Sequence, residues 1–212
     1  FAAGYMLQVV SEEKENRTME IMITSVTPAQ LIGGKASGLL AAALTQLMIY
    51  IIAGVIGLII AAQFIPELTY FKIPWTYLVV MALFFFPAYA LIASMMLAIG
   101  AAVTDVQQGQ QISGILNLVF LLPLFLLPIL FTNPNNPLII IMTLFPTTAF
   151  LTISLRWGLG SVPAWQLVAS WIILVSSAVF MVWGAARIFR AGMLRYGQAL
   201  SFRRIFLIVR GK

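Results

Sequence analysis

Charged side chains that could bind a partner are concentrated in residues 11–30, SEEKENRTMEIMITSVTPAQ, between two apolar segments. Glu13 and Arg17 are spaced i, i+4 in the favourable order, and Arg17 and Glu20 are spaced i, i+3. Such pairs stabilise helices, so the residues after Ser11 can form a charged helix. These charged side chains could recognise another molecule by electrostatic complementarity. The alternative is a solvated loop whose charges only fix the membrane topology.

A second helix is predicted directly after these charges. Thr27 stands at an N-cap position, Pro28 at the first helical position and Gln30 at the third, which together make a capping box. Apolar side chains lie between the charged residues and this cap. We therefore expect residues 11–33 to form an elbow of two short helices that meet at a bend and lie along the membrane surface.

Several classes of catalytic and metal chemistry are excluded. The chain has no cysteine and no histidine, which removes thiol nucleophiles, imidazole bases and the usual zinc or haem ligands. Residues 33–37, GGKAS, resemble the end of a phosphate-binding loop, but Ala29 replaces its first glycine and Ala36 its serine or threonine. We therefore expect no catalytic residue, no metal and no bound cofactor in this chain.

The composition is that of an integral membrane protein. Of the 212 residues, 62% are hydrophobic and 8% are charged, whereas a soluble domain has about 25% charged residues. The formal charge is +6. In a membrane protein, such a basic excess belongs on cytoplasmic loops and not on a nucleic-acid-binding face.

Four uncharged or nearly uncharged segments are long enough to span a bilayer as helices. Residues 1–10 resemble the end of a further span whose first part is missing. The sequence thus predicts an all-α polytopic helical bundle, residues 1–212 forming one transmembrane domain. The four full spans are residues 36–62, 75–101, 112–131 and 164–186.

Residues 138–155 are apolar but interrupted by Pro146. If they crossed the membrane, most basic residues, including those of the tail 187–212, would lie on the side opposite the elbow, against the positive-inside rule. We therefore predict a re-entrant helical hairpin on the outer side, broken near Pro146. Trp75, Trp157 and Trp165 then lie at the outer boundary, where tryptophan is favoured.

Small and polar residues within the spans are candidates for a substrate pathway or for helix packing. Gly34 and Gly38 begin a small-residue stripe, for which we expect packing within the chain more than a dimer contact. Polar side chains in spans commonly join helices by hydrogen bonds, so packing is also the simpler role for the others. The further candidates are Thr45, Gln46, Ser94, Asn117, Pro146 and Thr147.

The elbow resembles the cytoplasmic signature of the ABC-2 type permeases, approximately E-R/K-E-x-G-T-L-E-x-L followed by S-P-x-x-x-L-x-x-G-K. Arg17 replaces the usual glycine and Thr27 the commoner serine. FPTTAF at 145–150 is also similar to the family, and the tail sequence at 185–205 resembles the ending of its branch with a large outer domain. The matching positions are Glu13, Lys14, Glu15, Thr18, Glu20, Pro28, Leu31, Gly34 and Lys35.

This resemblance implies the membrane subunit of an ATP-driven exporter in a prokaryotic plasma membrane. Two permease copies would sit on ATP-binding cassette subunits, which hold ATP and Mg²⁺, and would alternate access across the membrane. The basic tail 187–212 is expected on anionic lipid or, less favoured, against the ATPase. The elbow residues implied in coupling are Glu12, Glu13, Lys14, Glu15, Arg17, Thr18, Glu20, Pro28, Leu31 and Lys35.

Two other classes stay open. An ion-coupled secondary transporter or channel normally needs a charged residue inside a span, and the four predicted spans contain none. Sodium sites made of carbonyl and hydroxyl oxygens escape that objection. A membrane-bound enzyme is the third class, but no nucleophile, base or metal constellation supports it.

Overall fold

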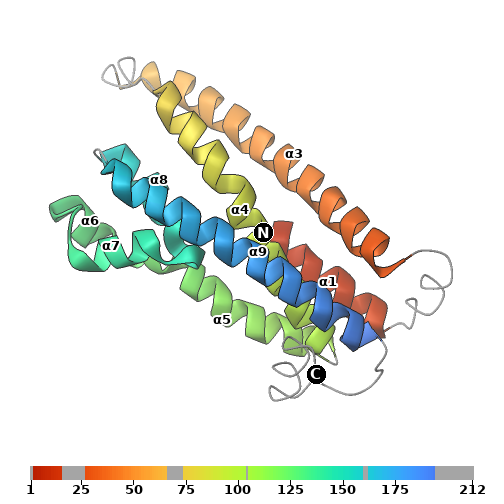
Figure 1. Cartoon of the computed structure of the whole chain (residues 1–212). Coiled ribbons are helices and arrows are strands. Elements are labelled where there is room, and N and C mark those ends of the chain that lie inside the picture. Colours follow the sequence, from red (N-terminus) through yellow and green to blue (C-terminus); the bar gives the residue numbers. More distant parts are fainter. Residues whose placement is uncertain (1, 16–26, 66–73, 104, 160–161, 194–212) are drawn as a thin grey trace.

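The described residues of the computed structural model are 2–15, 27–65, 74–103, 105–159 and 162–193, and they contain helices and no strand. Figure 1 shows these helices as an elongated bundle. The helices are α1 (Ala2–Glu15), α3 (Pro28–Ala62), α4 (Trp75–Ala102), α5 (Val106–Phe125), α6 (Leu127–Thr132), α7 (Pro137–Leu144), α8 (Pro146–Leu159) and α9 (Ala164–Met193).

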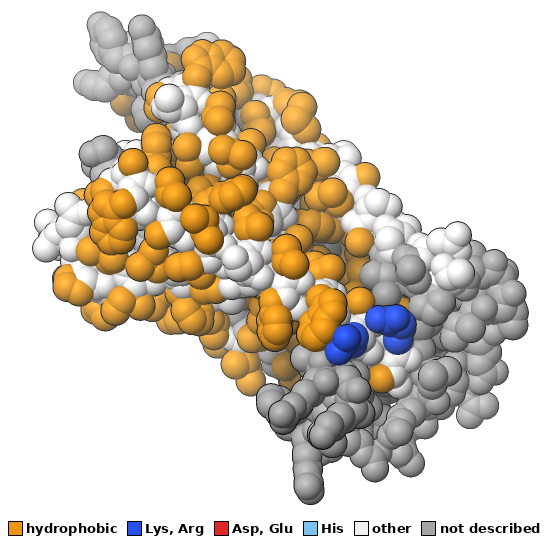
Figure 2. Space-filling view, viewed as in Figure 1, with side chains coloured by type: hydrophobic (Ala, Val, Ile, Leu, Met, Phe, Trp, Pro, Cys, Tyr) orange, Lys and Arg blue, Asp and Glu red, His pale blue; other side chains and the backbone are white. Residues whose placement is uncertain are grey.

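Four stretches of the described helices are long and apolar enough to cross a membrane, and each contains one of the four predicted spans. They are Gly33–Ala62, Trp75–Ala102, Val106–Thr132 and Ala164–Ala191. Figure 2 agrees, because apolar side chains cover most of the described part of the face in view, and the basic ones visible there gather beside the end of α9. The predicted all-α polytopic fold is confirmed.

The third predicted span, residues 112–131, is part of a longer helical stretch. The helix starts before Ile112, because α5 begins at Val106. The Asp105 side chain accepts a hydrogen bond from the backbone N–H of Gln108 at 2.7 Å, which satisfies a free donor of the first turn. At the other end, α5 contains Pro123 and stops at Phe125, and α6 follows.

The packing of α9 on α4 shows that these two helices run in the same direction. Phe84 of α4 shares a core cluster with Leu174 of α9, while Ala101 shares another with Phe189. The Trp171 indole also donates to the Leu83 carbonyl at 3.3 Å. Since α5 returns directly after α4, α5 ends and α9 begins at the same end of the bundle (Figure 1).

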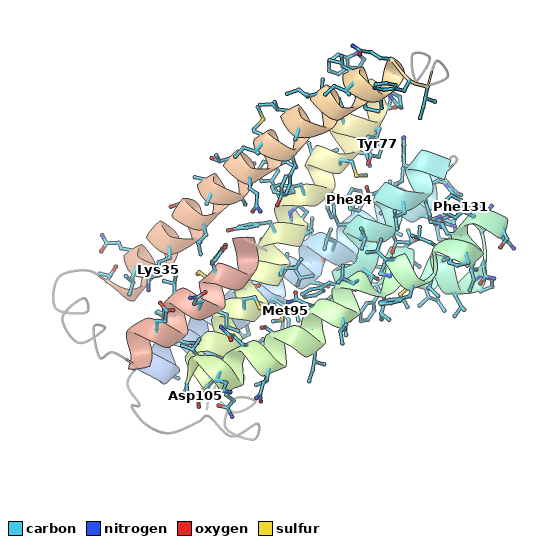
Figure 3. The ribbon with its side chains drawn as sticks, turned by 180° about the vertical axis from the view of Figure 1, so that it is seen from behind. Lys35, Tyr77, Phe84, Met95, Asp105 and Phe131 are labelled. Carbon is cyan, nitrogen blue, oxygen red and sulfur yellow. The ribbon has the colours of Figure 1, made fainter. Side chains whose placement is uncertain are left out.

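The bundle therefore has two distinct ends. At the elbow end, α3 and α5 begin and α1, α4 and α9 finish; at the hairpin end lie α6, α7 and the start of α9 (Figure 1). In Figure 3, Lys35 and Asp105 mark the elbow end, and Tyr77 and Phe131 mark the hairpin end. Residues 138–155 thus do not carry the chain from one end to the other, although their side of the membrane stays a prediction.

A core cluster at the elbow end joins α1 to α4 and α9. We call it the elbow-end core; its buried members are Met6, Leu7, Val10, Met96, Leu97, Ala101, Ala185, Ile188 and Phe189. Leu7 lies where α1 approaches two glycines. A Cβ on Gly100 of α4 would come within 3.0 Å of the Leu7 carbonyl oxygen, and one on Gly109 of α5 within 3.0 Å of the Leu7 side chain.

The long helix α3 lies mostly apart from these cores. In its span, the most apolar 18-residue window has no buried residue. A Cβ at Gly34 or Gly38, or at Gly54 or Gly57 further along, would meet no described atom within 4 Å. The expected packing of the small-residue stripe within the chain is therefore wrong for the part of the chain that the structure describes.

The close approach at Gly100 predicts that Gly100→Ala lowers the stability of the full-length protein in detergent by about 1–3 kcal/mol, because α1 must move away. Gly114→Ala in α5 is the matched control, since an added Cβ there meets open space and improves helix propensity. Thermal unfolding of both variants checks this. Equal stability of the two alanine variants would contradict the close contact.

Candidate functional site

The elbow begins inside a continuous helix. The segment expected as the end of a span and the first charged residues belong together to α1, which runs from Ala2 to Glu15. Ser11 is buried, whereas Glu12 is exposed and accepts a 2.7 Å hydrogen bond from the Gln8 side chain. The side chains of Glu13, Lys14 and Glu15, and all of Arg17, Thr18 and Glu20, lie outside the described residues.

The capping box at the other side of the elbow is confirmed. The Gln30 N–H donates to Thr27 Oγ1 at 3.3 Å, and the Thr27 N–H donates to Gln30 Oε1 at 3.0 Å. The prediction of a second short helix is wrong, because the helix that starts at Pro28 continues to Ala62. Neither Gly33 nor Gly34 interrupts it, so the coupling candidate Lys35 lies on the same rigid helix as the cap.

Both sides of the elbow are anchored in the same core. The last turns of α1 supply Val10 to the elbow-end core, and the first turns of α3 pack Leu31, Ala36 and Leu39 against it. That core also contains Ala101 near the end of α4 and Phe189 near the end of α9. The end of α1 and the start of α3 therefore share one packed core with α4 and α9.

The start of the predicted basic tail continues the last span as helix. α9 runs to Met193, beyond the expected limit at Ala186. The Arg187 guanidinium carbon lies 3.9 Å from the Trp183 ring centroid, a cation–π contact, and Arg190 Nε donates to the Ala186 carbonyl at 3.3 Å. The remainder of the tail, 194–212, lies outside the described residues.

The polar pathway candidates in the spans do not converge. Thr45 donates to the Ala41 carbonyl at 2.9 Å, and Ser94 donates to the Leu91 carbonyl at 2.8 Å. Gln46 donates to the Tyr50 hydroxyl at 2.7 Å, and Asn117 is exposed on α5. Each of these hydrogen bonds stays within one helix, so they do not join helices. A pathway role for these residues stays a prediction.

The hairpin breaks where Pro146 was expected to break it. α7 ends at Leu144 and α8 begins at Pro146, whose nitrogen carries no proton to donate to the Met142 carbonyl. The Thr148 hydroxyl donates to that carbonyl instead, at 2.7 Å, and the Thr152 hydroxyl also does so at 3.3 Å. Side chains thus replace the backbone bond that proline removes.

A second backbone carbonyl at the same break accepts a hydrogen bond from a side chain of α9. The Ser170 hydroxyl donates to the Thr143 carbonyl at 2.6 Å. Both residues are buried. The neighbouring Thr147 differs, because its hydroxyl is buried without a hydrogen-bond partner in the described part of the chain. The candidates Pro146 and Thr147 therefore both lie at the break between α7 and α8. Pro146 ends the backbone hydrogen bonding of α7, and the Thr147 hydroxyl has no hydrogen-bond partner among the described residues.

A buried arginine connects the parts of the hairpin. Arg156 of α8 is 2% exposed. Its Nη1 donates to Thr143 Oγ1 of α7 at 2.8 Å and to Gln166 Oε1 of α9 at 2.6 Å. Its Nη2 donates to Asn135 Oδ1, in the turn before α7, at 3.0 Å. One side chain thereby fixes α7, α8, α9 and the turn to one another.

The partners of Arg156 are neutral oxygens, although a buried cation is normally paired with an anion. The sequence contains no Asp or Glu after Asp105, so the hairpin and α9 offer no carboxylate. Burial lowers the pKa of the Arg156 side chain, yet arginine stays protonated in proteins. The sequence analysis used Arg156 only for topology; a charge beside an apolar segment is the signal that indicates such a site.

Adjacent threonines give a matched test of the hairpin break. Thr148→Val removes the donor to the Met142 carbonyl and should destabilise the protein by about 1–3 kcal/mol. Thr147→Val removes a hydroxyl without a described partner and should leave stability unchanged or slightly higher. Thermal unfolding in detergent measures both. Loss of stability in Thr147→Val alone would refute the assignment of these two hydroxyls.

The bond between Arg156 and Gln166 is tested by a double-mutant cycle. Gln166→Leu leaves the buried cation with one acceptor fewer and should cost about 2 kcal/mol. Adding Arg156→Met removes that cation, so the double variant should lose less stability than the sum of the two single variants. Additive losses in thermal unfolding would show that the two side chains are not coupled.

The comparisons with known proteins agree with this architecture. A family described as "ABC-2 family transporter protein" matches residues 1–187. An uncharacterized protein of Methanocaldococcus jannaschii, MJ1024, is 24% identical over 98% of this chain and 49% of its own length. The uncharacterized protein YhaP of Bacillus subtilis is 26% identical over 96% of this chain and 50% of its own length.

The chain thus spans about half the length of the curated relatives that it matches. No solved structure gives a significant match. The family match covers the described helices from α1 to most of α9. The chain belongs to the ABC-2 family of transporter proteins.

Proposed function

We propose that this chain is the membrane permease part of an ATP-driven exporter, in which a separate ATP-binding cassette subunit hydrolyses ATP. Family membership supports a transporter membrane domain. The single observation that carries the coupling proposal is the anchoring of both sides of the elbow in the elbow-end core. The cassette subunit holds ATP and Mg²⁺ in this proposal, and the permease supplies no catalytic group.

The coupling step follows from this anchoring. A cassette subunit that grips the elbow and closes on ATP moves the end of α1 and the start of α3 together. Val10 lies beside Gly100 of α4, Leu31 packs against the elbow-end core, and Leu7 fills the approach between Gly100 and Gly109. Because packed interiors transmit displacement, the spans shift as the elbow shifts.

The distribution of charge supports a protein contact at the elbow. The chain has six acidic residues, and four of them, Glu12, Glu13, Glu15 and Glu20, lie in the elbow. In Figure 2, the described surface beyond the elbow end is largely apolar, as for a lipid-facing wall. Charges at a subunit contact give orientation and specificity more than affinity, which suits a partner that must dock in one register.

The proposal also includes a second permease copy. The two copies together would expose a substrate path first to one side of the membrane and then to the other. One copy presents helices that are apolar over most of their exposed surface, with Ile115 and Leu118 of α5 more than half exposed. A translocation path between two such copies would open to one side and then to the other as the cassettes close and separate. Anionic lipid is the proposed contact of the basic tail.

Charge reversal tests the elbow as the docking element. The triple variant Glu13→Lys, Glu15→Lys, Glu20→Lys of the full-length protein should insert normally but lose co-purification of the cassette subunit and the ATP hydrolysis of the complex, because like charges oppose docking. Glu67→Lys lies between the first two predicted spans, on the side opposite the elbow in the predicted topology; it is the matched control and should retain both. Normal association of the triple variant would overturn the proposal.

A further inference from the structure

The end of α9 carries a stripe of aromatic and basic side chains on one face. Its members, Phe180, Trp183, Arg187 and Arg190, follow one another at intervals of three or four residues. The rings of Phe180 and Trp183 are exposed and lie 6.1 Å apart between centroids. The opposite face of the same turns supplies the elbow-end core. The α9 stripe therefore faces away from the described bundle, and in Figure 2 the basic side chains in view border the apolar surface.

Two exposed tryptophans of α9 indicate how deep this stripe lies in a membrane. At 1.5 Å per residue, Trp165 and Trp183 are about 27 Å apart along the helix. The hydrocarbon core of a bilayer is about 30 Å thick, and tryptophan is enriched at both of its boundaries. Trp183 therefore lies at the boundary nearer the elbow end. Arg187 and Arg190 follow one and two turns later, at the level of the lipid headgroups.

Both arginine side chains of the stripe turn back toward the bilayer. The Arg187 guanidinium carbon lies 3.9 Å from the Trp183 ring centroid, and Arg190 Nε donates to the Ala186 carbonyl at 3.3 Å. Long basic side chains at the end of a span commonly extend into water instead. The two guanidinium groups are thus held beside neighbouring residues of one helical face, where like charges repel each other.

An anion beside this face could accept hydrogen bonds from both arginines. Stacking on Trp183 uses the face of the Arg187 guanidinium group, whereas its N–H donors lie in the plane of the group. Arg190 bonds to Ala186 through Nε, and its two Nη atoms carry further donors. α9 contains no Asp or Glu. A phosphate group binds arginine through paired, charge-assisted hydrogen bonds and would offset the repulsion.

The apolar neighbours of the arginines indicate that this phosphate belongs to a lipid. Val179 and Phe180 lie on the bilayer side of the arginines and are more than half exposed. A soluble phosphate would leave these side chains uncovered, whereas a phospholipid places its acyl chains along them and its phosphate at the arginines. A headgroup with a net negative charge is favoured, because a choline headgroup would bring its own cation beside the arginines.

We propose that Trp183, Arg187 and Arg190 form a discrete site for the phosphate of one anionic phospholipid, whose acyl chains lie along Val179 and Phe180. The site deepens the lipid contact proposed for the basic tail, and it rests on that proposal for the membrane placement of the end of α9. One lipid held in one geometry replaces a diffuse attraction by many charges. The elbow and ATP take no part, so failure of this site would leave the proposed coupling intact.

The test measures lipid binding by native mass spectrometry of the full-length protein in mild detergent, without cassette subunit or nucleotide. Dioleoylphosphatidylglycerol should bind tightly, in preference to dioleoylphosphatidylcholine with the same acyl chains. The double variant Arg187→Lys, Arg190→Lys keeps both charges but loses the paired hydrogen bonds and the planar stacking, and should bind about tenfold more weakly. The control Arg203→Gln, Arg204→Gln removes two charges from the tail and should bind like the unchanged protein.

Thermal unfolding gives the second readout and controls for folding. Without lipid, both double variants should melt close to the unchanged protein. Phosphatidylglycerol should raise the Tm of the unchanged protein and of the tail variant, and should raise that of Arg187→Lys, Arg190→Lys less, because a ligand stabilises the state that binds it.

Three results would overturn the proposed lipid site. Unchanged lipid binding by Arg187→Lys, Arg190→Lys, or equal weakening by both double variants, would show a diffuse attraction between charges. Displacement of the lipid by inorganic phosphate at the same concentration would identify a site for a soluble anion. Loss of the bound lipid when the cassette subunit joins the complex would identify that subunit as the occupant of the α9 stripe.

Discussion

The structure depends on the rule that a backbone polar group inside hydrocarbon must find a partner within the protein. Most of the chain obeys it with long helices, in which each N–H pairs with a carbonyl one turn earlier. At Pro146 the rule cannot be met by the backbone, because proline has no N–H for the Met142 carbonyl. Thr148 and Thr152 from α8, and Ser170 from α9 for the next carbonyl, supply the missing donors. The chain can therefore reverse inside an apolar bundle.

This reversal determines the direction of everything that follows. α5 ends and α9 begins at the hairpin end, so α9 runs parallel to α4 and finishes at the elbow end. Arg156 holds the reversal together by hydrogen bonds to Thr143, Gln166 and Asn135. The elbow and the end of α9 then lie at the same end of the bundle, where the proposed cassette subunit would reach the charged elbow and the core that joins it to the spans.

Much of the fold could be predicted from the sequence, because apolar length and capping are local properties. The four spans, the cap at Thr27 and the break at Pro146 each follow from a few neighbouring residues. The start of α5 at Val106 could not be predicted from apolar length, because a helix capped by Asp105 extends through polar residues before the apolar span begins. The second short helix of the elbow was wrong because nothing after Pro28 ends the helix before Ala62.

The candidate site was less predictable, because it depends on contacts between distant segments. The resemblance indicated the elbow residues, but only the structure shows that Val10 and Leu31 meet in one core. The network around Arg156 joins residues as far apart in the sequence as Asn135 and Gln166. The spacing of its members follows no helical period, so the sequence alone does not group them. The free hydroxyl of Thr147 could be distinguished from the bonded hydroxyl of Thr148 only by geometry.

The most direct test of the central claim is the sidedness of three single cysteines in the full-length protein, with any other cysteine replaced by serine. Glu12→Cys and Arg190→Cys lie at the elbow end, and Asn133→Cys lies at the hairpin end, all at exposed positions. A membrane-impermeant maleimide on intact cells should label only Asn133→Cys, and the other two should react after permeabilisation. Labelling of Glu12→Cys and Arg190→Cys from opposite sides would contradict the account.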